Sequence, residues 1–286
     1  MTEVELKNTK GYEVISKWLA AKGFIPFSFQ EETWQHIINN KSGLVNAPTG
    51  CGKTFSVFLG AIISFINSNP ENYLTKNRNG LQLLWITPLR ALAKDIGRAM
   101  EEVIEELGMS WKVGIRNGDT SLSERAKQKR QIPEVLIITP ESLHLLLAQK
   151  HYPEIFKTLK IIAVDEWHEL LGSKRGVQVE LALSRIIGQR LQDSKLTNNA
   201  NFDSAGSSKP SFIQPSALNV WGISATIGNL QQAEEVLLSS LSQIGLKQKD
   251  FKTVTAVIDK PIQIESIFPD EIEKYRAAGE GRSPPA

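Results

Sequence analysis

Short apolar runs alternate along the chain with segments in which apolar residues recur every three or four positions. The apolar runs lie at 43–46, 82–87, 112–115, 135–139, 161–165 and 217–223. Helical periodicity predicts helices at 11–22, 55–66, 92–107 and 177–191, with a further helix around Trp34. Unbroken apolar strands that alternate with helices are typical of a parallel sheet covered on both faces. The pattern therefore predicts an α/β fold with a mostly parallel sheet and helices on both faces.

The predicted helix at 92–107 is indicated by apolar residues that recur at helical spacing. These residues are Leu92, Ile96, Ala99, Val103 and Leu107. Their spacing of three or four positions places them on one stripe of a helix.

Ligands of parallel sheets bind beyond the carboxyl ends of the strands. Several loops of this chain follow directly on predicted strands. We therefore expect these loops to share one edge of the sheet, and they begin after Asn46, Thr87, Ile115, Thr139, Asp165 and Ser224.

The first of these loops is Ala47-Pro48-Thr49-Gly50-Cys51-Gly52-Lys53-Thr54. Its glycines can adopt backbone angles closed to other residues, so successive N–H groups can curl around phosphate oxygens at the positive end of the next helix. Lys53 would reach the β- and γ-phosphates, and the Thr54 hydroxyl would complete a Mg²⁺ shell. The stretch fits G-x-x-x-x-G-K-[ST] except at Ala47, which is small enough for the turn. The alternative is a glycine-rich helix cap with a chance lysine. The predicted ATP contacts are Gln30, Thr49, Gly50, Cys51, Gly52, Lys53 and Thr54.

Gln30 lies in an aromatic-rich turn, Gly23-Phe24-Ile25-Pro26-Phe27-Ser28-Phe29, shortly before the phosphate loop. A glutamine side chain offers one acceptor and two donors, which complement N6 and N7 of adenine. On its own it reads equally as an ordinary glutamine at a helix start. Its place before the loop favours a contact to the base.

The second chemical signal is Asp165-Glu166-Trp167-His168, at the end of a buried apolar strand. A carboxylate there is costly unless it pairs with a cation, so we expect Asp165 to hold Mg²⁺, directly or through water. Glu166 would polarise the attacking water. His168 would link the nucleotide to neighbouring loops, or it is a surface residue. The alternative for Asp165 and Glu166 is a helix N-cap pair.

The polar stretch at 193–216 reads as a flexible insertion. The strand that follows it ends in Ser224-Ala225-Thr226. The hydroxyls of Ser224 and Thr226 could relay between the γ-phosphate and a bound polymer, although this tripeptide alone carries no information.

Composition narrows the class of protein further. The chain has 286 residues, of which 41% are hydrophobic and 22% charged, and its net charge of +2 neither requires nor excludes a nucleic acid. No apolar run reaches the roughly 18 residues of a membrane span. A single cysteine excludes an internal disulfide and fits a reducing compartment, so we expect a cytoplasmic protein. The acidic, polar start, Met1 to Lys10, does not resemble a signal peptide.

These motifs occur in the order and spacing of superfamily 2 helicases, which the chain resembles over about residues 20–270. Gln30 resembles their Q motif, residues 87–92 motif Ia and residues 139–142 motif Ib. Together with Gly172-Ser173-Lys174-Arg175-Gly176 and residues 224–229, they are similar to the Lhr group. Because its third residue is Trp167, the Asp165 motif resembles that of the bacterial ligase-associated DEXH helicases.

The resemblance implies a RecA-like P-loop NTPase domain that couples ATP and Mg²⁺ to movement on single-stranded nucleic acid, with DNA favoured. It implies unwinding or annealing, a role in DNA repair, and a DNA ligase or an exonuclease-like protein as partner. It also implies coupling by His168, Ser224 and Thr226. The implied strand contacts are Pro88, Arg90, Gly118, Thr120, Thr139, Pro140 and Glu141. For Arg90 the alternative is a solvated arginine at a helix start.

The predicted organisation is a helical lead-in at 1–22, a RecA-like domain at 23–270 and a disordered or non-native tail at 271–286. Helicases of this type need a second RecA-like domain that supplies an arginine finger, and the residues after Thr226 are too few for one. Truncation, a frameshift or a gene fragment would explain this equally. Two other functions remain open: a P-loop ATPase that does not act on nucleic acid, and a fragment that binds nucleotide without catalysis.

Overall fold

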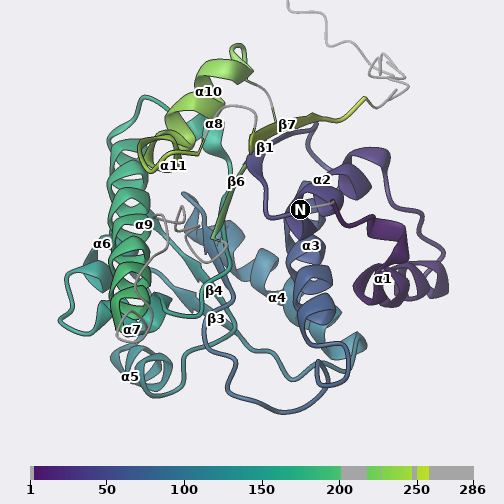
Figure 1. Ribbon diagram of the computed structural model, residues 1–286, viewed down its shortest axis with the longest axis horizontal. Helices are drawn as coiled ribbons and strands as arrows, with labels where there is room; N and C mark the ends of the chain where they lie inside the picture. Colours follow the sequence, from purple (N-terminus) through teal and green to yellow (C-terminus); the bar gives the residue numbers. More distant parts are fainter. Residues whose placement is uncertain (1–2, 201–217, 226, 247–249, 258–286) are drawn as a thin grey trace, which may run out of the picture.

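Seven parallel strands form a single sheet in the computed structural model, which describes residues 3–200, 218–225, 227–246 and 250–257 (Figure 1). The strands are β1 Ser42–Asn46, β2 Leu83–Ile86, β3 Val113–Arg116, β4 Val135–Ile138, β5 Ile161–Val164, β6 Asn219–Ser224 and β7 Phe251–Thr255. Their order across the sheet is β3-β4-β2-β5-β6-β1-β7, and every neighbouring pair runs parallel. The predicted α/β fold with a parallel sheet is confirmed.

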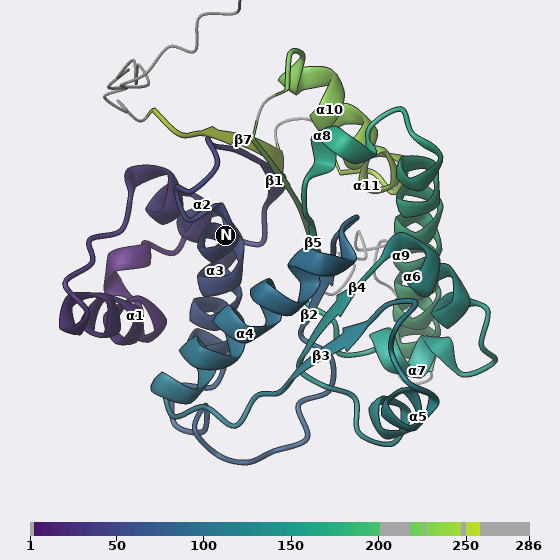
Figure 2. The same cartoon turned by 180° about the vertical axis from the view of Figure 1, so that it is seen from behind.

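Helices cover both faces of the sheet (Figures 1 and 2). One face carries α1 Lys10–Ala21, α2 Ser28–Ile38, α3 Lys53–Ser68 and α4 Arg90–Glu106. The other carries α6 Pro140–Leu147, α7 Tyr152–Phe156, α8 Trp167–Leu170, α9 Lys174–Ala200, α10 Leu230–Leu237 and α11 Ser239–Gln243. The remaining helices are the short 3₁₀ turn η1 Leu6–Asn8 and α5 Leu122–Arg130, which follows β3.

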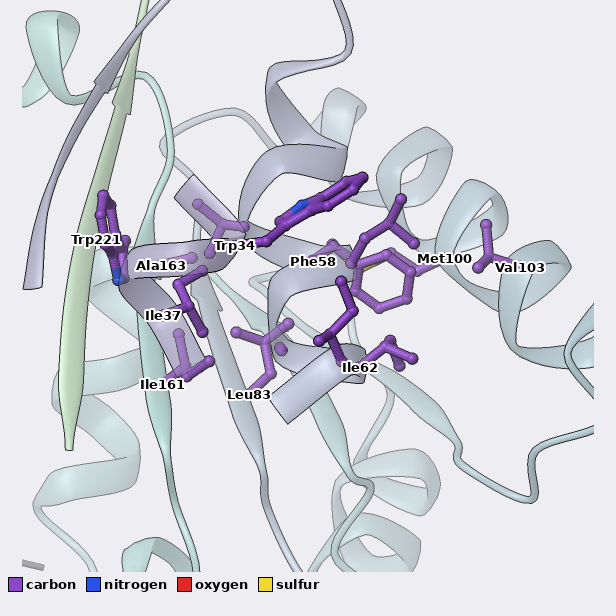
Figure 3. Close-up of a cluster of buried hydrophobic side chains, with 14 of the residues drawn as sticks. Trp34, Ile37, Phe58, Ile62, Leu83, Met100, Val103, Ile161, Ala163 and Trp221 are labelled. Atoms are coloured by element: carbon purple, nitrogen blue, oxygen red, sulfur yellow. The ribbon is translucent and has the colours of Figure 1, made fainter. Parts of the chain in front are cut away.

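The sheet divides the apolar interior into two cores because successive strand residues point to opposite faces. In β2, Leu83 and Trp85 join the core beneath α1 to α4, whereas Leu84 and Ile86 join the core on the other side. Figure 3 shows the first core, where Trp34 lies near side chains from α3 and α4 above the strands. Strands β2, β4, β5 and β6 are therefore buried on both faces, which explains their largely apolar sequence, whereas the edge strands β3 and β7 are only partly buried.

The apolar stripe of α4 largely packs against the core, since Val103 is buried and Ile96 and Leu107 contact the core, but its first residue does not. Leu92 is 37% exposed, and the buried residues of the helix are Ala93, Gly97, Met100, Val103 and Ile104. A Cβ built on Gly97 would lie 3.0 Å from Ile115 and 3.5 Å from Ile137. The small residues Ala93 and Gly97 thus lie where α4 comes closest to the sheet. A pattern of large apolar residues does not reveal such positions.

The predicted start of the insertion at 193–216 also differs from the structure. Helix α9 continues through residue 193 to Ala200, because a polar composition rich in good helix formers such as Gln192, Lys195 and Leu196 does not end a helix. Residues 201–216, Thr226 and the predicted tail at 271–286 lie outside the described residues.

Strand β7 pairs with β1 at a position that tolerates only glycine. A Cβ on Gly43 would lie 1.9 Å from the backbone oxygen of Lys252. We therefore expect Gly43→Ala to lower the free energy of unfolding by on the order of 2 kcal/mol, measured by urea denaturation. The matched control is Gly188→Ala in α9, where a Cβ meets nothing within 4 Å and should raise stability by up to about 1 kcal/mol. Equal effects of the two substitutions would contradict the β1–β7 register.

Candidate nucleotide-binding and strand-binding site

Several buried polar atoms at the carboxyl edge of the sheet make no hydrogen bond within the described part of the chain. They are Asn46 Oδ1, Lys53 Nζ, Thr87 Oγ1 and Glu166 Oε2. A buried polar group without a partner costs about 1–3 kcal/mol. Because these groups follow strands β1, β2 and β5, their grouping marks this edge as the place where a polar ligand would bind.

The loop at 47–52 has the backbone shape that a phosphate cradle needs. Gly50 and Gly52 adopt positive φ angles of 76° and 73°, and Lys53 begins α3 directly afterwards. The Ala47 N–H donates to the Ser224 carbonyl at 3.0 Å, so the loop starts from a fixed point on β6. Lys53 is 8% exposed, and its ammonium group is therefore a buried cation at a helix N-terminus.

Gln30 holds the same loop from α2. Its Nε2 donates to the Gly52 carbonyl at 3.0 Å, and its Oε1 accepts from the Phe27 N–H at 2.9 Å. A Cβ on Gly52 would lie 2.9 Å from Gln30 Nε2, so glycine is required here for space as well as for backbone angle. The side chain thus positions the loop, and each end of its amide keeps further hydrogen-bonding capacity for a base.

A cavity of about 350 Å³ opens beside the loop. Its lining comes from the phosphate loop, the turn after α1, the first turns of α3 and the second half of α4. On its outer side Glu106 accepts from Trp18 Nε1 at 2.9 Å and pairs with Lys22 at 2.6 Å. The cavity is apolar and next to Gln30, so it suits a planar base.

Asp165 ends β5 and is 5% exposed. Its carboxylate accepts from Trp85 Nε1 at 3.3 Å and from the Glu166 N–H at 3.0 Å. Burial, together with the neighbouring charge of Glu166, raises the pKa of Asp165 to about 6. A carboxyl group held at this cost is suited to a divalent cation.

Glu166 and His168 lie between β5 and β6. Glu166 has a left-handed backbone, with φ 47°, which is strained for a residue with a side chain. Its Oε2 lies 3.4 Å from His168 Nδ1, and that nitrogen lies 3.1 Å from Ser224 Oγ. The structure therefore brings together Glu166, His168 and Ser224.

Arg90, Gly118 and Thr120 gather beside the end of β3. The Arg90 guanidinium lies over Gly118, where a Cβ would be 2.8 Å from Nη2, and it pairs with Asp119 at 3.4 Å. Thr120 Oγ1 donates to the Ile115 carbonyl at 3.1 Å. These contacts fix the loop and leave the Arg90 side chain 56% exposed.

Pro88, Thr139, Pro140 and Glu141 lie at the neighbouring ends of β2 and β4. Thr139 precedes α6 as its N-cap residue, and its Oγ1 donates to Ser142 Oγ at 3.2 Å. The carboxyl ends of β3, β4 and β2 are adjacent. These residues therefore form a continuous edge with Arg90 and with the loop after β3 that contains Gly118 and Thr120.

Two contacts of this site had no signal in the sequence pattern. The Trp85 indole binds Asp165 across 80 positions of sequence, and Arg175 reaches Glu141 at 2.7 Å and the Pro88 carbonyl at 3.4 Å. Asn46 and Thr87 were recognisable only as polar residues at strand ends.

A phosphate-loop cradle and an Asp–Glu pair at the carboxyl edge of a parallel sheet define a RecA-like domain. The chain belongs to the DEAD/DEAH box helicase family, whose profile matches residues 27–233. No helix in the described ranges combines the length and apolarity needed to span a bilayer.

Lhr-type helicases are among the relatives. The Lhr helicase/uracil glycosylase of Escherichia coli (strain K12) is 34% identical over 172 residues, which are 56% of this chain and 11% of that protein. The ATP-dependent helicase Lhr-Core of Sulfolobus acidocaldarius is 29% identical over 261 residues, 89% of this chain and 26% of that protein. The solved Mycobacterium smegmatis helicase Lhr bound to ssDNA and AMP-PNP is 25% identical, with a TM-score of 0.65, and the match covers 88% of this chain and 28% of that one. The chain spans less than a third of each of these proteins.

The raised pKa of Asp165 gives a pH-dependent prediction. The folded domain binds the proton of the Asp165 carboxyl group more tightly than the unfolded chain does. Above about pH 6 the ionised carboxylate therefore destabilises the ligand-free fold. This destabilisation is relieved as the pH falls from 6 toward 3.8. We expect Asp165→Asn to gain about 1 kcal/mol of stability relative to the parent when the pH is raised from roughly 5 to roughly 7.5. Urea unfolding without nucleotide or metal measures this, with the exposed Asp95→Asn as control. A parent and an Asp165→Asn variant that respond equally to pH would contradict it.

Proposed function

We propose that the chain is the ATP-binding motor domain of an ATP-dependent helicase or translocase that acts on single-stranded nucleic acid, with DNA favoured. The carrying observation is the buried ammonium group of Lys53 at the start of α3, which makes no hydrogen bond in the described part of the chain and follows two glycines with positive φ. A phosphate chain supplies the acceptors that this group lacks. The related Mycobacterium smegmatis Lhr, solved with ssDNA and AMP-PNP, supports the choice of ligands.

The residues present fit a nucleotide with Mg²⁺. Loop N–H groups at 49–54 and Lys53 would hold the phosphates, and Gln30 with the adjacent cavity would take the base. In the described residues no three His, Cys, Asp or Glu side chains gather as a metal site, so Thr54 and Asp165 would share Mg²⁺ with phosphate oxygens and water. The metal would neutralise charge on the transferring phosphoryl group.

Glu166 would orient and polarise the attacking water; its buried Oε2 makes no hydrogen bond in the described residues and lies 3.4 Å from His168 Nδ1. His168 lies within reach of both Glu166 and Ser224. Movement of Ser224 at the end of β6 would therefore reach the water-polarising carboxylate through His168. We assign this contact the role of coupling hydrolysis to the bound strand.

The strand would follow the edge formed by the ends of β2, β3 and β4. The backbone N–H groups of Glu141 and Ser142, the hydroxyls of Thr120 and Thr139, and Arg90 suit phosphate contacts that do not read sequence. Pro88 and Gly118 would shape the path. Partnership with a DNA ligase or an exonuclease-like protein stays a prediction.

Two other functions make different predictions. An ATPase uncoupled from nucleic acid would turn over at the same rate with and without a strand. A nucleotide-binding fragment would bind ATP and never hydrolyse it, even when a second RecA-like domain is supplied.

Substitutions of Lys53 and Glu166 should distinguish nucleotide binding from ATP hydrolysis. Lys53→Ala removes the charge-assisted contact to phosphate and should weaken binding of fluorescent ATP analogues at least tenfold. Glu166→Gln keeps the shape and loses the charge, so it should retain binding and lose hydrolysis when the chain is paired with a second RecA-like domain. Parent-like hydrolysis by Glu166→Gln would show that its assigned role is wrong.

The isolated 286-residue polypeptide should bind ATP but hydrolyse it barely above background. An arginine finger contributes roughly 10³–10⁵ in rate, and in helicases of this type it comes from a second RecA-like domain. Single-strand affinity should fall with salt, by about 0.7 in log–log slope for each phosphate neutralised. ATPase and fluorescence anisotropy with and without single-stranded DNA measure both. Strong DNA-stimulated turnover that persists on dilution would contradict the expectation, because activity from self-association falls faster than concentration.

A further inference from the structure

Arg175 joins two loops that lie far apart in sequence. Its Nε donates to Glu141 Oε1 at 2.7 Å, and its Nη1 donates to the Pro88 carbonyl at 3.4 Å. Pro88 follows β2, and Glu141 lies in the first turn of α6 after β4. One guanidinium thus connects the ends of two adjacent strands at the proposed strand-binding edge.

The position of Arg175 is unfavourable for helix stability. Lys174 and Arg175 begin the 27-residue helix α9, whose first turn has no acidic residue. Cations at a helix N-terminus oppose the helix dipole. A helix that carries this cost at its start indicates that the guanidinium is needed where it lies.

The turn before α9 is shaped to place this side chain. Ser173 Oγ donates to the Leu170 carbonyl at 2.6 Å and accepts from the Gly176 N–H at 3.1 Å. A Cβ on Gly176 would lie 2.1 Å from the Leu170 oxygen, so only glycine fits. The close packing of this turn fixes the direction in which α9 starts.

Glu141 is the reason why a cation is needed. Its carboxyl group lies in the first turn of α6, the end of the helix that would face a phosphate of the strand. Burial opposes its ionisation, but hydrogen bonds from its own backbone N–H and from Arg175 outweigh burial and lower the pKa of Glu141. The group therefore stays charged, and without Arg175 that charge would repel the strand.

We infer that Arg175 is a positioning residue for strand binding, which neutralises Glu141 and holds the Pro88 and Glu141 loops in one arrangement. It acts through Glu141 and not by its own contact to a phosphate. The inference rests on the proposed function, because it assumes that the strand follows this edge.

The test is a double-mutant cycle on the full 286-residue chain. Arg175→Gln should weaken binding of a single-stranded DNA probe about 5- to 10-fold, because it exposes an unpaired carboxylate to the phosphates. Arg175→Gln combined with Glu141→Gln should recover most of that affinity, since the repelling charge is gone. The single variant Arg175→Lys should recover less strand affinity than the double variant, because an ammonium group cannot satisfy the two acceptors in the planar geometry of a guanidinium.

The control is Lys17→Gln. It removes one positive charge and breaks the exposed pair with Glu13 on α1, and it should leave strand affinity unchanged. Binding of a fluorescent ATP analogue reports whether each variant retains its fold. A parent-like affinity for Arg175→Gln would overturn the inference.

Failure of Glu141→Gln to rescue binding, with a salt slope reduced by about 0.7, would also overturn it in favour of a direct phosphate contact. The proposed function is tested separately by the parent chain and Arg90→Gln. A parent that binds no strand, or Arg90→Gln that binds as tightly as the parent, would count against that function whatever Arg175 does.

Discussion

The parallel alignment of the seven strands is the constraint on which the site depends. Parallel strands end at one edge, and Lys53, Asp165 and Ser224 meet there although more than 170 positions separate the first from the last. The same alignment buries the central strands on both faces, so water has little access to the polar groups at their ends. Lys53 Nζ and Thr87 Oγ1 then make no hydrogen bond in the described residues. A phosphate would supply the acceptors that Lys53 lacks.

Sequence reasoning predicted six of the seven strands and their shared edge because each depends on local signals, whereas the partly exposed edge strand β7 has no unbroken apolar run and was not predicted. A buried parallel strand must be apolar throughout, and a strand end must turn, so period and composition suffice. The side of α4 that faces the sheet could not be read in this way. Gly97 approaches Ile115 because it is small, and only the distance between two elements shows that smallness is required.

Contacts between residues far apart in the sequence could not be predicted for the same reason. Trp85 supports Asp165, and Arg175 supports Glu141, through side chains whose partners lie 80 and 34 positions away. Tryptophan in a buried strand is explained by packing alone, and arginine at a helix start by solvation alone. Their second role appears only when the strand order β2-β5 and the start of α9 are known.

The nucleotide cavity and the strand-binding edge share helix α4. Arg90 lies at one end of this helix over Gly118, and Glu106 at the other end walls the cavity and binds Trp18 and Lys22 on α1. A helix does not compress along its axis, and the close-packed core beneath it leaves little room for independent movement. One helix therefore contributes residues both to the cavity beside the phosphate loop and to the edge that carries Arg90.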